Sequence, residues 1–133
     1  MSQGNVEIVK RVIDDYNRRD LDAYDQFFTP DFELFPAFRG AVEGGSYRGR
    51  EGIERLFDAT PDTWEDFRLI ADEFRDLGDR VLVVGRVEGR GRGSGVPVDA
   101  QTETIFDFRD GKVSRVRAYL DHGEALRAAG PAE

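Results

Sequence analysis

The sequence contains no cysteine and a single histidine, His122, and these shortages limit the metal and redox chemistry open to it. Without cysteine there is no disulfide and no thiolate ligand for zinc, and one histidine cannot supply an all-histidine site. Only an oxygen-rich metal site could be assembled, from the 27 acidic residues, and no calcium-loop spacing is present among them. We therefore expect no metal and no cofactor.

Positive charge is also scarce, because 19 basic residues against 27 acidic ones leave a formal net charge of −8. Such a chain repels a phosphate backbone unless its basic side chains gather on one face. The nearest cluster is Arg86, Arg90 and Arg92, which glycines and Glu88 interrupt, and this pattern is more typical of a solvated turn. A nucleic-acid partner is not expected.

Long apolar runs are missing as well. No segment approaches the roughly 20 apolar residues of a membrane span, and the first eleven residues, MSQGNVEIVKR, lack the apolar core of a signal peptide. We expect a cytoplasmic protein with no membrane partner. A length of 133 residues fits one domain covering residues 1–133, with a single core.

The strongest secondary-structure pattern lies at residues 98–121. Small, hydroxyl and apolar side chains alternate there with charged and amide ones, as in a half-buried strand. The residues of the apolar parity are Val98, Ala100, Thr102, Thr104, Phe106 and Phe108. Asp110-Gly111 follows and is typical of a two-residue type I′ turn, so residues 112–120 are predicted to fold back as an antiparallel strand.

Helical and extended patterns alternate before this hairpin. Apolar spacing and capping residues predict helices at residues 5–18, 20–28 and 51–60, with Thr29-Pro30 and Pro61 as their stops. Strands are predicted at 31–38, 64–77 and 81–89, with a glycine-rich loop at 39–49 and a turn at Gly78-Asp79. A short last helix begins at Asp121, where Glu124 completes a capping box. This order favours an α+β fold with helices on one face of a curved antiparallel sheet.

Three segments, NRRDLDAYDQFFTPDFEL, SYRGREGIERLF and FDFRDGKVSRVRAYLDHGEAL, resemble successive signatures of SnoaL-like domains in the nuclear transport factor 2 fold. The resemblance implies a cone-shaped, curved antiparallel sheet with three helices from the N-terminal half and a short C-terminal helix, enclosing a pocket for a small molecule. It also implies a homodimer, usually formed through the outer sheet face. It implies no single chemistry, because the fold hosts cyclases, isomerases, hydrolases, dehydratases and domains without catalysis.

The resemblance can be carried to single positions. Where ketosteroid isomerases hold their catalytic groups this chain has Val12, Phe35 and Thr104, none of which can move a proton in the way needed. Limonene epoxide hydrolases and SnoaL-like cyclases have a catalytic Asp on the last strand, and Ala118 stands at that position. The other two hydrolase residues, an Arg and an Asp two apart, resemble Arg86 and Glu88.

Arg86 and Glu88 have two interpretations. If their parity faces the pocket, they are a cation and a carboxylate that bind and polarise a ligand. If Val81, Val83 and Val87 hold the buried side, the pair is a solvent salt bridge of little energetic value.

The remaining candidates divide between catalysis and ligand contact. Asp121 is a further catalytic candidate beside Glu88 and Arg86, although it also serves as a helix cap. The predicted pocket residues are Tyr16, Tyr24, Trp64, Thr102, Thr104, Ala118 and His122, with core packing as the competing role for the aromatic ones. The sequence thus predicts a protein that binds a small apolar or aromatic molecule, with SnoaL-like hydrolase, cyclase or dehydratase activity as one interpretation. The other is a noncatalytic ligand-binding or dimerisation module.

Overall fold

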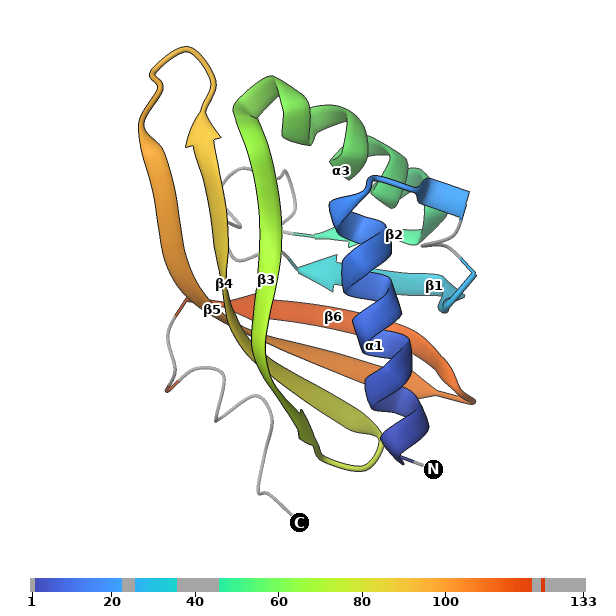
Figure 1. The fold of residues 1–133 in the computed structure, drawn as a ribbon. Helices are drawn as coiled ribbons and strands as arrows, with labels where there is room; N and C mark the ends of the chain where they lie inside the picture. The colour runs from blue at the N-terminus through green and yellow to red at the C-terminus, as the bar shows by residue number, and fades with distance from the viewer. Residues whose placement is uncertain (1, 23–25, 36–45, 121–122, 124–133) are drawn as a thin grey trace.

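A computed structural model describes residues 2–22, 26–35, 46–120 and 123, which form an α+β structure around one open six-stranded sheet (Figure 1). The strand order across the sheet is β2-β1-β6-β5-β4-β3. The elements are α1 (Ser2–Asn17), β1 (Phe28–Phe35), β2 (Tyr47–Arg48), α3 (Gly49–Thr63), β3 (Trp64–Asp76), β4 (Arg80–Gly91), β5 (Pro97–Arg109) and β6 (Lys112–Tyr119).

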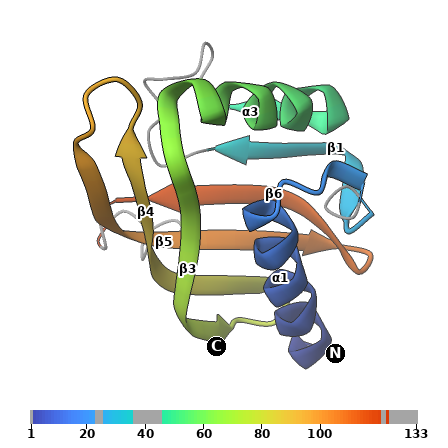
Figure 2. The same ribbon diagram turned by 45° about the horizontal axis from the view of Figure 1, so that its top comes forward.

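Helix α1 lies across one face of the sheet (Figure 2). Val9, Val12 and Ile13 recur at helical spacing and are buried, while Glu7 and Lys10 form an ion pair between exposed side chains. The buried residues join those of α3 and of five strands in one hydrophobic core. Both described helices therefore pack into the same core.

Both predicted hairpins are confirmed. Asp110 and Gly111 have positive φ angles of 53° and 80°, as a type I′ turn requires, and Arg109 pairs with Lys112 across them. Gly78 has a φ of 88° in the turn between β3 and β4. These turns align β3, β4, β5 and β6 as consecutive antiparallel neighbours.

Strand β1 departs from the sequence prediction in two ways. It begins at Phe28, so Phe28, Thr29 and Pro30 belong to the strand and do not end a helix. It also pairs with β6 in parallel, which corrects the expectation of an antiparallel sheet throughout. The β1–β6 register shifts between Phe28 and Glu33, and Pro30 lies in this irregular stretch, where its missing N–H breaks no regular ladder.

Helix α3 is longer than predicted at both ends. It begins at Gly49 and continues to Thr63, so Pro61 lies in its last turn and does not close it. In the region predicted as a second helix, Leu21 and Asp22 are helical and residues 23–25 lie outside the described part of the chain. The predicted loop at 39–49 and the C-terminal helix also fall largely outside it.

The long strands have two distinct faces. On the inner face, Val81, Val83 and Phe106 pack with α1 in the main core. On the outer face, Leu82 and Ile105 form a separate small cluster. Because side chains alternate along a strand, every odd-numbered residue from 81 to 91 and every even-numbered one from 98 to 106 belongs to the inner face.

The end of α1 is bonded to the free edge of β3. The Asn17 amide donates to the Leu69 carbonyl at 2.8 Å, and its oxygen accepts from the Leu69 N–H at 2.9 Å. Arg19 Nη2 donates to the Phe67 carbonyl at 2.7 Å. Asn17 thereby satisfies the edge as one residue of a neighbouring strand would, which covers part of the edge and fixes this end of β3.

Candidate functional site

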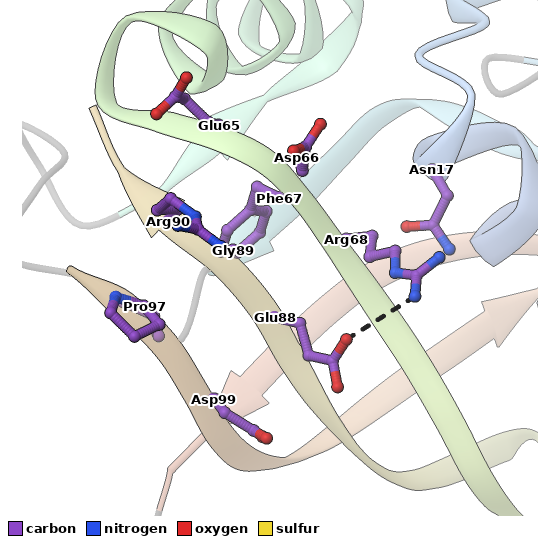
Figure 3. Close-up of a pocket in the computed structure, with 11 residues that line it drawn as sticks. Asn17, Glu65, Asp66, Phe67, Arg68, Glu88, Gly89, Arg90, Pro97 and Asp99 are labelled. Carbon is purple, nitrogen blue, oxygen red and sulfur yellow. Dashed lines mark ion pairs between the residues drawn. The ribbon is translucent and has the colours of Figure 1, made fainter. Parts of the chain in front are cut away.

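A hollow of about 670 Å³ lies at one end of the sheet, where β3 begins, β4 ends and β5 begins (Figure 3). Its lining residues are Asn17, Glu65, Asp66, Phe67, Arg68, Glu88, Gly89, Arg90, Pro97, Val98 and Asp99. They include positions of both parities, because the hollow lies at the ends of the strands and not on one face alone. The β3 register shifts here, around Asp66, whose φ is 54°.

Glu88, a predicted catalytic residue, lines this hollow and is held by two arginines. Its Oε2 accepts from Arg86 Nε at 3.2 Å, and its Oε1 lies 3.7 Å from Arg68 Nη2 (Figure 3). Arg86 also donates to both oxygens of Asp72, at 3.0 and 3.1 Å. The hydrogen bond to Glu88 raises the pKa of Arg86, with the charge of Asp72 as the next cause.

The structure decides which face the predicted pair occupies. Val81, Val83 and Val87 are buried on the inner face, so Arg86 and Glu88 project from the outer one, with side chains 37% and 33% exposed. This is the arrangement of the second interpretation given above. Glu88 still borders the hollow, whereas Arg86 is not among its lining residues.

Three other predicted residues share the inner face. Thr102 and Thr104 are 3% and 4% exposed, and Ala118 of β6 lies opposite Thr104 in the register. The Thr102 hydroxyl oxygen is buried without a hydrogen-bond partner in the described structure. A buried hydroxyl without a hydrogen-bond partner lowers the stability of the fold and is uncommon in native proteins.

A row of small side chains joins Thr102 to the hollow. Val98 lines the hollow, Ala100 follows on the same face of β5, and Thr102 comes next. At about 3.3 Å per residue the row spans about 13 Å. Val98 and Ala100 are half-buried whereas Thr102 is buried, so solvent access decreases from the hollow inward.

Two tyrosines pack in or against the hydrophobic core, Tyr47 buried and Tyr16 half-buried. Burial raises the pKa of Tyr16, a predicted pocket residue, against the opposing charge of Arg19 and with a smaller contribution from Tyr47. Burial also raises the pKa of Tyr47, which is 9% exposed on β2. Sequence reasoning missed Tyr47 because it ends a glycine-rich loop. The available signal was its place directly before a helix, where an apolar residue packs back on the first turns, and Gly52 of α3 does contact it.

The other predicted site residues lie at the start of β3 or outside the described part of the chain. Trp64 begins β3, directly after α3. Tyr24, Asp121 and His122 lie outside the described residues, so their roles stay predictions. Within the described ranges, no three acidic or histidine side chains are grouped in a way that could hold a metal ion. No helix in those ranges is both long and apolar enough to cross a membrane.

Comparison with known protein families identifies the family of this chain. The family model of the SnoaL-like domain matches residues 9–116, which is most of the chain. The chain belongs to the SnoaL-like domain family. No curated protein matches this SnoaL-like chain.

Several solved structures share the fold. TerC, crystallised with polyporic acid, is 27% identical over 91% of this chain and 94% of its own, with a TM-score of 0.77. A putative polyketide cyclase from Sinorhizobium meliloti is 28% identical over 84% and 93% of the two chains, with a TM-score of 0.67. An NTF2-like protein of unknown function from Burkholderia pseudomallei, 21% identical over 96% and 98% with a TM-score of 0.78, supports the fold alone.

Proposed function

We propose that this SnoaL-like protein binds a small apolar or aromatic organic molecule on the inner face of its sheet, with the hollow at the strand ends as the entrance. The observation that carries the proposal is the buried Thr102 hydroxyl, which has no hydrogen-bond partner in the described structure and lies at the inner end of the row from Val98. Binding sites for small molecules typically combine apolar walls with a few placed polar groups.

The relatives support the same class of ligand. TerC was crystallised with polyporic acid, and the Sinorhizobium meliloti protein is described as a putative polyketide cyclase. Both are more than 25% identical to this chain and cover most of it. Polyporic acid and polyketide-like ketones are therefore the first ligands to test.

We favour binding without catalysis, since Ala118 replaces the carboxylate that related enzymes use and no charged side chain stands on the inner face of β4 from residue 81 to 91. A second candidate, an enzyme acting in the hollow, is favoured by Glu88, which lines it. Both Glu88 oxygens already face arginines, so a substrate would have to displace an ion pair before a proton could be taken.

Two aromatic substitutions on adjacent residues of β5 test the location. Ala100→Phe fills the inner-face row and should weaken binding of an uncharged polyketide-like ketone at least tenfold, measured by titration calorimetry. Gln101→Phe is the matched control, because Gln101 is exposed on the outer face, and its affinity should equal that of the unmodified protein. Equal affinities in both variants, or no saturable binding of polyporic acid or of a panel of polyketide-like ketones, would refute the proposal.

Turnover in the same panel separates the two candidates, because a binding protein without catalysis turns over none of its compounds. If a compound is turned over, Glu88→Gln should abolish the reaction when Glu88 is the base and leave the rate unchanged when catalysis lies elsewhere, because the amide keeps the shape but cannot take a proton.

We also propose a homodimer. The resemblance supplies this expectation, and Leu120, which follows β6, is an exposed large apolar side chain that an interface could cover. Sedimentation at micromolar concentration should give twice the 15.0 kDa chain mass. A single species of chain mass at all concentrations would contradict it.

A further inference from the structure

We infer that the ligand of the inner-face site is an uncharged ring compound with a hydroxyl or carbonyl oxygen, and that Thr102 selects for that oxygen. This inference rests on the proposed function and narrows it to a chemical class.

Thr102 is the place where a ligand oxygen would be needed. Its side chain is 3% exposed, and its hydroxyl oxygen has no partner within the described part of the chain. A buried hydroxyl without a partner loses its hydrogen bonds to water and gains nothing in return. A ligand oxygen beside Thr102 would restore one bond, whereas a plain hydrocarbon would leave the hydroxyl unpaired.

The inner-face positions of the two strands around Thr102 carry no charge. The inner-face residues of β4 and β5 are Val81, Val83, Val87, Val98, Ala100, Thr102, Thr104, Phe106 and the glycines 85, 89 and 91. Arg86 lies one residue from Gly85 but points to the other face, where Glu88 and Asp72 occupy its guanidinium. A ligand carboxylate on the inner face of these strands would lose its hydration, and neither strand would supply a counter-ion. The net charge of −8 would also repel such an anion.

An ammonium group meets the same obstacle, since neither strand places a carboxylate on the inner face. The acidic side chains Glu88 and Asp99 lie opposite each other on the outer parity. Neutral hydrogen bonding is therefore the one polar interaction that these two strands offer a ligand there. A site built for one hydrogen bond discriminates chiefly against ligands that lack the matching atom.

Three probes of nearly equal size test this at pH 7: naphthalene, 1-naphthol and 1-naphthoate. Dissociation constants are measured by fluorescence titration for the unmodified protein, Thr102→Val and Thr102→Ser. We expect 1-naphthol to bind the unmodified protein about tenfold more tightly than naphthalene does, and 1-naphthoate to bind at least tenfold more weakly than 1-naphthol. Thr102→Val, which keeps the shape, should remove the preference for 1-naphthol and leave naphthalene unchanged. Thr102→Ser, which keeps the hydroxyl, should retain most of the preference for 1-naphthol.

The outcomes separate this inference from the proposed function. If naphthalene and 1-naphthol bind equally well to both the unmodified protein and Thr102→Val, binding on the inner face stands and the role of Thr102 is wrong. If 1-naphthoate binds most tightly, the uncharged class is wrong. Failure of all three probes to bind, together with failure of the polyketide-like ketones, would overturn the proposed function itself.

Discussion

Asp107→Asn is expected to lower the free energy of unfolding by about 2 kcal/mol, since removing one partner of a largely buried ion pair leaves the other charge uncompensated. Asp107 lies on the outer face of β5. It accepts from Arg115 Nε at 3.0 Å and from Arg117 Nη2 at 2.9 Å, and Arg80 Nε lies 3.9 Å away. The Asp107 and Arg117 side chains are each 15% exposed. Asparagine keeps the size of the side chain but not its charge, so the largely buried Arg117 would have no counter-ion at this position.

Urea denaturation measures the loss, with Glu7→Gln as the control. Glu7 pairs with Lys10 on α1, but the two side chains are 66% and 51% exposed, so this variant should stay within about 0.5 kcal/mol of the unmodified protein. The contrast tests burial, because each substitution neutralises one carboxylate of an ion pair. Similar midpoints for the two variants would show that the Asp107 cluster is no more than a surface network.

The turns could be predicted from sequence because their signals are local. Asp110-Gly111 and Gly78 need positive φ angles, which those residue types tolerate, and no distant contact has to be known. Strand β1 could not be predicted in the same way. Its pairing with β6 joins Glu33 to Arg115, more than 80 residues apart, and the Thr29-Pro30 pair looks like a helix stop when read alone.

The candidate site was predictable in part, for a related reason. Alternation along β5 correctly grouped Thr102 with Phe106 on the buried parity. For β4 the valines favoured the inner side as the buried one, whereas the resemblance to epoxide hydrolases favoured a pocket position for Arg86 and Glu88, and the sequence left both interpretations open. Only the packing of α1 on Val81 and Val83 decides between these interpretations. Neither alternation nor resemblance could reveal that the Thr102 hydroxyl has no hydrogen-bond partner among the described residues, because this depends on atoms from several strands.

The need for glycine at position 85 is another feature that could not be predicted from the sequence. It was one of 15 glycines in the chain, with no turn signal around it. In the structure a methyl group at Gly85 would lie 2.0 Å from the Ile70 carbonyl oxygen and 3.1 Å from the Ala71 Cα. These are backbone atoms of β3, whose register shifts just after Ala71, so the close approach arises from an irregularity in the neighbouring strand.

Gly85→Ala is therefore expected to lower the free energy of unfolding by about 3 kcal/mol, at the upper end of the range for overpacking. A flexible side chain could rotate away from the new methyl group, but a carbonyl of the β3 backbone can move only if its strand moves, which breaks ladder hydrogen bonds to β4. Gly4→Ala is the matched control: a methyl group there meets nothing within 4 Å, and alanine is the better helix former, so α1 should gain about 0.5 kcal/mol. Urea denaturation of both variants should give shifts of opposite sign. Unchanged stability of Gly85→Ala would mean that the β3 backbone can move away from the new methyl group at little cost, and that the close approach at Gly85 does not constrain the strand.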